Sequence, residues 1–163
     1  MMHAFKYHGW RRLAESFAAV MERSLAEVGS GPLVPVPTDP QRTWRRGYDQ
    51  AAVLTVALGN LTGRQVLMNG LHRSRRAGSQ VRLTPEQRLA NLAGVFRAGR
   101  LPREVVLVDD VFTTGATLLS AAGVLRGAGV AQIGGLTFAR AEPPLAAAAH
   151  QGRDHTFFGS ERF

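Results

Sequence analysis

The residues best suited to chemistry in this sequence lie together between positions 105 and 118, in the run VVLVDDVFTTGATL. Two neighbouring carboxylates, Asp109 and Asp110, follow an apolar, β-branched stretch that ends at Val108. Such a stretch is typical of a strand that is buried on both faces of a parallel sheet. Open α/β sheets bind their ligands at the carboxyl ends of the strands, so we expect both carboxylates to face a crevice there.

A small, hydroxyl-rich turn follows the carboxylates and leads into a helical pattern that begins near Leu118. The unpaired backbone N–H groups of such a turn can surround a phosphate, Gly115 lets the backbone approach it closely, and threonine hydroxyls add donors. The residues that we expect to bind the phosphate are Thr113, Thr114, Gly115, Ala116 and Thr117.

Asp109 and Asp110 must serve a different group, because carboxylates repel phosphate. Sugar hydroxyls donate hydrogen bonds to carboxylates, and a hard cation such as Mg²⁺ binds carboxylate oxygens directly or through water. The run therefore predicts a ribose-phosphate site in which Asp109 and Asp110 are the catalytic and metal-binding residues. The simpler alternative is that the two carboxylates cap a helix and that the threonines form an ordinary turn.

The composition is typical of one globular domain without structural zinc. The chain has 163 residues, of which 45% are hydrophobic, enough for a single domain with a core. It has no cysteine, and its five histidines lack the spacing of a zinc site, so we expect neither disulfides nor zinc. No long apolar run and no leading signal occur, so we expect a cytoplasmic protein without membrane insertion.

Positive charge is concentrated between positions 40 and 103, where 12 arginines stand against only Asp49 and Glu86. The whole chain carries a formal net charge of +8. A concentrated basic stretch attracts anions, whether a pyrophosphate or a nucleic acid backbone. For any single arginine, a solvated surface position is an equally good interpretation.

The elements that must position these residues alternate between strand and helix patterns. This alternation predicts an α/β fold with a central, mainly parallel sheet flanked by helices. The stretch from Ala141, with Phe157 and Phe158 near its end, is either a docked tail or an interface. The expected elements are a helix over 13–28, a strand over 33–36, an arginine-bearing loop over 37–50, a helix over 54–61, a strand over 65–68, a mobile loop over 72–83, a helix from Thr84, a strand over 105–108, a helix over 118–125 and a strand over 133–139.

The run from Val105 resembles the PRPP-binding motif of type I phosphoribosyltransferases. In that motif, four hydrophobic residues and two acidic residues precede a threonine- and glycine-rich loop. The resemblance implies the type I phosphoribosyltransferase-like fold with a flexible hood loop. It also implies that Asp109 and Asp110 contact the 2′ and 3′ hydroxyls of phosphoribosyl pyrophosphate (PRPP), and that residues 113–117 hold its 5′-phosphate.

Further segments occur in the order and spacing of the ComF family of competence-associated, phosphoribosyltransferase-like proteins. The similar segments, between Phe5 and Arg140, are PVP, RRGYDQA, LHRSRRAGSQ, LTPEQRLANLAGVF and VLVDDVFTTGATL. Two features depart from the family's pattern. Asp49 stands where asparagine is common, and the four-cysteine zinc ribbon that begins many members is absent, which indicates either a short form or a truncated N-terminus.

The resemblance implies transfer of a phosphoribosyl group from PRPP, with Mg²⁺, to an acceptor that the sequence does not identify. Arg45 and Arg46 follow the first strand, where guanidinium groups can clamp a phosphoanion. The hood of type I phosphoribosyltransferases closes over the pyrophosphate, so the resemblance adds Arg73, Arg76 and Gln80 as candidates. We therefore expect Arg45, Arg46, Arg73 and Arg76 to bind the pyrophosphate.

The alternative function is that of a non-catalytic competence protein. Trp44 and Tyr48, together with the nearby arginines, can offer stacking and phosphate contacts to single-stranded DNA. The family's association with DNA uptake also makes a helicase of the uptake machinery a candidate partner, and a homodimer is a further expectation.

Overall fold

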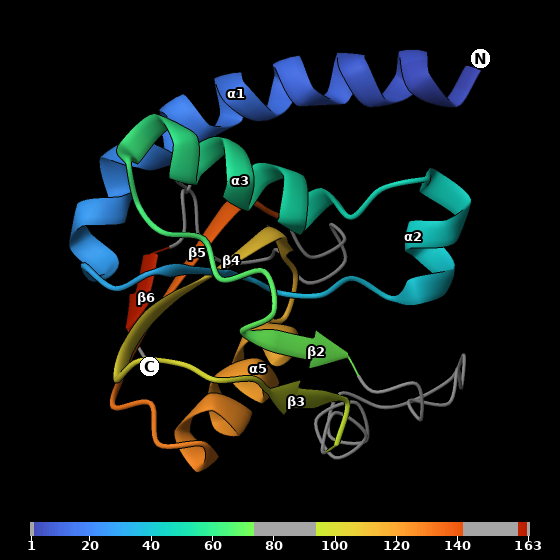
Figure 1. Cartoon of the computed structure of the whole chain (residues 1–163). Coiled ribbons are helices and arrows are strands. Elements are labelled where there is room, and N and C mark those ends of the chain that lie inside the picture. The colour runs from blue at the N-terminus through green and yellow to red at the C-terminus, as the bar shows by residue number, and fades with distance from the viewer. Residues whose placement is uncertain (1, 74–93, 142–159, 163) are drawn as a thin grey trace, which may run out of the picture.

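The computed structural model describes residues 2–73, 94–141 and 160–162 of the chain. Four of its strands form one sheet, namely β1 (Leu33–Pro35), β4 (Glu104–Phe112), β5 (Gln132–Arg140) and β6 (Ser160–Arg162), in the order β1–β4–β5–β6 (Figure 1). β1, β4 and β5 are parallel, whereas β6 pairs antiparallel with β5. The predicted α/β class, with a mainly parallel sheet, is confirmed.

Helices cover both faces of this sheet (Figure 1). α1 (Met2–Val28) and α3 (Gln50–Thr62) pack together on one face, and α5 (Ala116–Gly127) packs on the other. Two short strands, β2 (Leu71–Arg73) and β3 (Phe96–Ala98), form a separate antiparallel pair. In the described part of the chain, no helix is both long enough and apolar enough to span a membrane.

The central strand β4 separates two hydrophobic layers. Val105 and Leu107 face the core beneath α5, while Val106 and Val108 face the core beneath α1 and α3. All four side chains are fully buried, and each contributes roughly 1.5–3 kcal/mol to stability through burial. The predicted strand buried on both faces is therefore confirmed, and its alternating contacts hold the following carboxylates in a defined register.

The stretch after β1 is not simply a loop, because it contains a short helix, α2 (Pro40–Arg46). Asp39 caps this helix by accepting a hydrogen bond from the backbone N–H of Gln41 at 2.8 Å. Pro40 suits the first helical position because its missing N–H has no partner to lose there. The local capping signal thus prevailed over the loop-like composition of the stretch.

The predicted strand over 65–68 is wrong. Only Val66 forms a bridge there, with Leu33, and the chain enters its next strand later, at Leu71. The physical reason is a turn in which the N–H of Gly70 donates to the carbonyl of Leu67 at 3.0 Å, which ends the pairing beside β1.

Some expectations fall on other parts of the chain. Residues 72 and 73, expected in the mobile loop, belong to β2, and the rest of that loop lies outside the described residues. The helix predicted from Thr84 and the Phe157–Phe158 pair also lie outside them. Ser160–Arg162, in the final stretch, do pair with β5 as β6.

Candidate functional site

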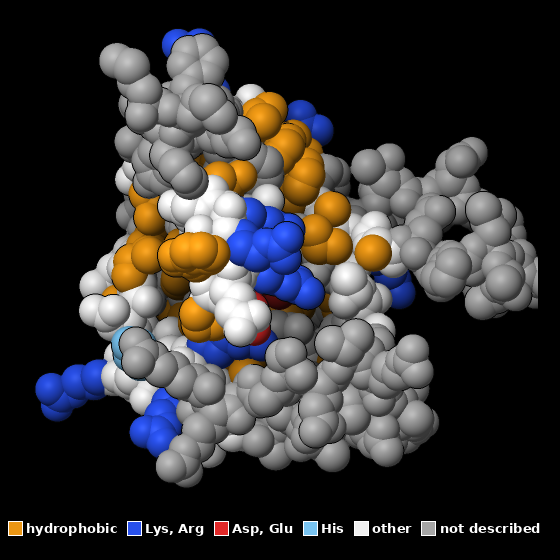
Figure 2. All heavy atoms as spheres, turned by 90° about the vertical axis from the view of Figure 1, so that its right-hand side faces the viewer, with side chains coloured by type: hydrophobic (Ala, Val, Ile, Leu, Met, Phe, Trp, Pro, Cys, Tyr) orange, Lys and Arg blue, Asp and Glu red, His pale blue; other side chains and the backbone are white. Residues whose placement is uncertain are grey.

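A hollow of about 450 Å³ opens where β1 and β4 reach their carboxyl ends. Figure 2 shows this side of the molecule, with basic side chains gathered near its centre and acidic side chains visible beneath them. The hollow brings together side chains from the loop after β1, from α2, β2 and β4, and from the turn before α5. Its charged and hydroxyl-bearing lining residues are Thr38, Asp39, Arg42, Arg46, Arg73, Asp109, Asp110, Thr113 and Thr117.

Asp109 and Asp110 lie within β4 rather than beyond it. The sequence suggested a strand that stops at Val108, but pairing with β5 extends β4 to Phe112. A carboxylate oxygen of Asp109 accepts from the N–H of Asp110 at 2.9 Å, and one of Asp110 accepts from the N–H of Val111 at 2.8 Å. The sheet therefore holds both carboxylates firmly at the hollow.

Burial raises the pKa of Asp109 to about 7, and repulsion from Asp110 and Asp49 adds to this effect. The hydrogen bond from the backbone of Asp110 acts in the opposite direction. Near neutral pH, this carboxyl group therefore occurs in both protonation states. A cation or a hydroxyl donor beside it would favour the charged form, which is what Mg²⁺ and a ribose would each supply.

The turn after β4 leads directly into the N-terminus of α5. Gly115 occupies the N-cap position with φ at 73°, in the left-handed region that favours glycine. Because Gly115 has no side chain to cap the helix, the N–H groups of the first turn can serve an anion. Thr113, Gly115 and Thr117 also surround a small recess beside Asp109.

The other two predicted phosphate-binding residues complete the same turn. Thr114 is exposed, and its hydroxyl oxygen accepts weakly from the N–H of Ala116 at 3.4 Å. Ala116 is the first residue of α5. All five predicted residues thus belong to one turn at the helix N-terminus, with Thr113 and Thr117 lining the larger hollow.

Two arginines from α2 line the hollow, and they are not the predicted pair. Arg42 and Arg46 lie four residues apart and share one side of the helix. Arg45, named from the sequence together with Arg46, is exposed and does not line the hollow. The spacing of Arg42 and Arg46, read with the Asp39–Pro40 helix start, is the signal that would have identified Arg42.

Arg73 enters the hollow from β2. Its guanidinium group donates to the carbonyl of Pro37 at 3.4 Å, lies 3.9 Å from a carboxylate oxygen of Asp39, and stacks 5.5 Å from the centre of the Phe96 ring. Burial lowers the pKa of Arg73, although Asp39 opposes this effect, and the guanidinium stays charged at any physiological pH. Of the other hood candidates, Arg76 and Gln80 lie outside the described residues.

The donor set at the hollow is of the kind that holds Mg²⁺ together with the phosphate oxygens of a ligand. Mg²⁺ is commonly held by one or two carboxylates together with phosphate oxygens and water. Asp109 and Asp110 provide that number of carboxylates. Within the described ranges, no group of three or more histidine, cysteine or acidic side chains could hold a metal ion by itself.

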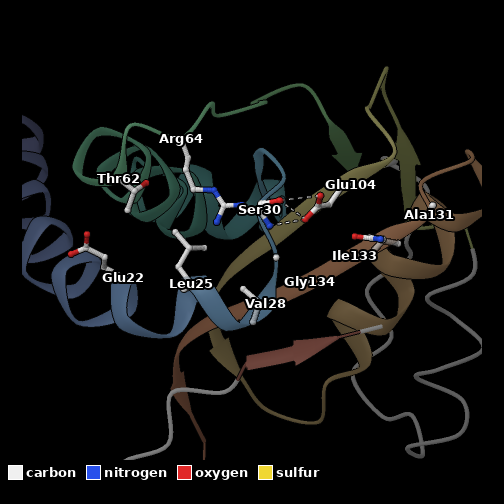
Figure 3. A pocket seen from close by; sticks show the side chains of 13 residues that line it. Glu22, Leu25, Val28, Ser30, Thr62, Arg64, Glu104, Ala131, Ile133 and Gly134 are labelled. Carbon is white, nitrogen blue, oxygen red and sulfur yellow. Dashed lines mark hydrogen bonds between the residues drawn. The ribbon is translucent and has the colours of Figure 1, made fainter.

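A larger hollow, of about 940 Å³, lies where β4 and β5 begin, and two of its charged groups, Glu104 and Arg64, stabilise the fold (Figure 3). Glu104 accepts hydrogen bonds from the backbone and hydroxyl of Ser30 and from the N–H of Gly31. Arg64 extends toward the same turn and donates to the carbonyl of Gly31. These groups fasten the α1–β1 turn to β4.

Comparison with known proteins relates this chain to competence proteins. Over 106 residues it is 38% identical to competence protein F of Haemophilus influenzae. The aligned region covers 62% of this chain and 46% of that protein. The chain is a homologue of competence protein F. It is also 36% identical over 104 residues to the DNA utilization protein YhgH of Escherichia coli K12, with 62% of this chain and 45% of that protein covered. The resemblance to the ComF family is therefore confirmed.

This homologue of competence protein F matches only part of each relative. The chain spans about half the length of these two curated relatives. No protein family model matches it. Among solved structures, glutamine PRPP amidotransferase of B. subtilis superposes with a TM-score of 0.51 at 20% identity, over 77% of this chain and 26% of the other. That likeness confirms the type I phosphoribosyltransferase-like fold.

Proposed function

We propose that this protein binds PRPP together with Mg²⁺ and transfers the phosphoribosyl group to an acceptor, releasing pyrophosphate. The observation that supports the proposal is the lining of the 450 Å³ hollow. The two carboxylates of β4, a threonine-bearing turn at a helix N-terminus and three arginines surround one space, and the third carboxylate there, Asp39, pairs with Arg73. These are the groups that a ribose diol, a 5′-phosphate and a pyrophosphate respectively require.

Each group of residues has a distinct role in this proposal. Asp109 and Asp110 accept hydrogen bonds from the ribose hydroxyls and supply the carboxylate oxygens for Mg²⁺. Residues 113–117 bind the 5′-phosphate through backbone N–H groups and hydroxyls. Arg42, Arg46 and Arg73 bind the pyrophosphate.

Catalysis at this site depends on charge, and it needs no side-chain nucleophile. Breaking the bond between C1 and the pyrophosphate oxygen leaves positive charge on the ribose ring and negative charge on the leaving group. The arginines stabilise the leaving pyrophosphate, and the carboxylates at Asp109 and Asp110 favour the positive ring. Bound Mg²⁺ adds further neutralisation of the pyrophosphate charge.

The test is a calorimetric titration of the protein with PRPP, with and without Mg²⁺. We expect saturable binding that requires Mg²⁺ and that Asp109→Asn with Asp110→Asn abolishes. Arg42→Ala with Arg46→Ala should weaken binding by tenfold or more, whereas Arg45→Ala, which removes a charge from the same helix outside the hollow, should change it less than twofold. A folded wild-type protein that does not bind PRPP would refute the proposal.

A second candidate function is binding of single-stranded DNA, which the exposure of Trp44 favours. This side chain is 84% exposed on α2, beside the exposed Arg45. An aromatic ring can stack on a nucleic acid base, and the guanidinium groups beside it can neutralise the charge of the nucleic acid backbone. With this candidate we also propose a helicase of the DNA-uptake machinery as a partner. Self-association and a cytoplasmic location are proposed for either function.

The two candidates respond differently to the same variants. DNA binding should weaken steeply as salt rises and should weaken further in Trp44→Ala and Arg45→Ala. It should persist when Asp109 and Asp110 are changed to Asn. Fluorescence titration with an oligothymidylate at two salt concentrations distinguishes these outcomes.

A further inference from the structure

We infer that Asp49, which lies outside the hollow, positions Arg42 and Arg46, the two arginines that α2 contributes to the hollow. One carboxylate oxygen of Asp49 accepts from the N–H of Thr38 at 2.9 Å. The other accepts from the hydroxyl of Thr38 at 3.1 Å and from the N–H of Ala52 at 3.2 Å. A single carboxylate thus joins the loop after β1 to the first turn of α3.

The segment between these two residues contains the whole of α2. Two contacts of its side chains add to the hydrogen bonds of Asp49: the Arg46 guanidinium donates to the side-chain oxygen of Gln50 on α3, and Asp39 pairs with Arg73. α2 has seven residues, and none of them is buried. A helix this short is not stable by itself in water, and most helices in proteins owe their stability to a packed apolar face, which α2 lacks. Its position therefore depends on how the chain is fastened at its two ends.

Both ends of α2 lead to the Asp49–Thr38 contact, which we call the clasp. At the N-terminal end, Thr38 directly precedes Asp39, the N-cap residue of α2. At the C-terminal end, Gly47 closes the helix with φ at 85°, two residues before Asp49. The clasp brings these ends together and so sets where Arg42 and Arg46 stand relative to Asp109 and Asp110.

The sign of the expected effect separates positioning from simple electrostatics. PRPP is an anion, so removing a nearby negative charge should by itself tighten its binding. Loss of the clasp should weaken binding instead, because the two arginines lose their place. Asparagine retains one acceptor oxygen for the N–H of Thr38, and its amide group can donate to the Thr38 hydroxyl, so both bonds to Thr38 remain while the bond from the N–H of Ala52 is lost. Asp49→Asn should therefore bind PRPP at least as tightly as wild type. Asp49→Ala should bind PRPP about tenfold more weakly, a change in affinity that corresponds to the loss of one hydrogen bond to a charged group.

The experiment has one readout that needs no ligand and one that rests on the proposed function. Hydrogen exchange of the α2 amides should be markedly faster in Asp49→Ala than in wild type, while the amides of β4 keep their protection. PRPP titrations then compare Asp49→Ala in the wild-type background and in the Arg42→Ala, Arg46→Ala background. The tenfold loss should vanish in the second background, since no arginine is left to position.

Two results would overturn the inference. Unchanged exchange in α2 would show that Asp49 does not hold this helix. An equal loss of PRPP affinity in both backgrounds would show that Asp49 acts generally on the fold. If the wild-type protein does not bind PRPP, the proposed function fails and the exchange measurement alone decides on Asp49. If Asp49→Ala does not fold, Thr38→Val, which removes only the hydroxyl bond, should still accelerate α2 exchange, and its failure to do so counts against the clasp.

Discussion

The ring of Phe112, at the end of β4, lies directly against Gly115, the N-cap residue of α5. A Cβ atom added to Gly115 would lie 2.8 Å from Cζ of that ring, closer than real Cβ contacts. The guanidinium carbon of Arg140 lies 5.2 Å from the ring centroid and helps to hold the ring in place. The Phe112 ring and the absence of a side chain at Gly115 together set the path of the turn at residues 113–117, which we propose binds the phosphate.

We predict that Gly115→Ala destabilises the protein and abolishes PRPP binding. The left-handed backbone costs alanine roughly 1 kcal/mol, and the contact with Phe112 adds roughly 1–3 kcal/mol. Denaturant unfolding measures the first effect, and calorimetry with PRPP measures the second. Gly123→Ala is the matched control, because Gly123 lies within α5 with open space around it, and it should gain about 0.5–1 kcal/mol. Normal PRPP binding by Gly115→Ala would refute the role of this turn.

The raised pKa of Asp109 predicts that its contribution to stability falls as pH rises. Well below pH 3.8, the group is protonated in both the folded and the unfolded chain. Between its ordinary value of 3.8 and about 7, the unfolded chain releases the proton first, so the folded state loses stability across this window. At pH 8 the cost approaches about 4 kcal/mol as an upper bound.

Asp109→Asn lacks this titration and provides the comparison. The free energy of unfolding of the variant, relative to wild type, should rise from pH 5 to about pH 7 and then level off by pH 8. Urea unfolding of both proteins at four pH values measures the difference. A constant difference over this range would show that the pKa of Asp109 is not raised.

Thr137, which pairs with Asp109 from β5, should tolerate loss of its hydroxyl. The side chain is buried, and its hydroxyl has no hydrogen-bond partner among the described residues. Leaving such a group unpaired costs roughly 1–3 kcal/mol, so the nearly isosteric Thr137→Val should raise the free energy of unfolding by about 1 kcal/mol. Thr137→Ser, which keeps the hydroxyl and loses the methyl group, should lower it. A destabilised valine variant would mean that the hydroxyl has a partner in solution.

Glu104 should stabilise the fold without affecting PRPP. Hydrogen bonds from Ser30 and Gly31 lower the pKa of this carboxylate. A lowered pKa means that the stabilising effect is present above the ordinary value of 4.5 and is lost as the pH falls through the folded value. Glu104→Gln should therefore unfold at lower denaturant than wild type at pH 7, with a smaller difference at pH 3. Weakened PRPP binding by this variant would contradict the assignment of the larger hollow to the fold alone.

Local features of the sequence are enough to predict the central strand β4, the two carboxylates on it and the turn that leads into α5. The run from Val105 to Val108 predicts a doubly buried strand because its side chains suit both faces of a parallel sheet. Asp109, Asp110 and the turn that follows are consecutive in the chain, so their proximity needs no tertiary information. For the same reason, the helix starting near Ala116 could be placed from the sequence alone.

The tertiary structure decided which distant residues share the hollow. Arg42 rather than Arg45 lines it, because the direction of each side chain depends on whether the segment is helical. The helix α2 in turn depends on its caps and on the hydrogen bonds that join its ends to α3. Arg73 reaches the hollow only because β2 pairs with β3. Asp49 meets Thr38, and Glu104 meets Ser30, through contacts that join separate segments of the folded chain. Periodicity can describe one segment at a time, whereas these contacts depend on the packing of several segments.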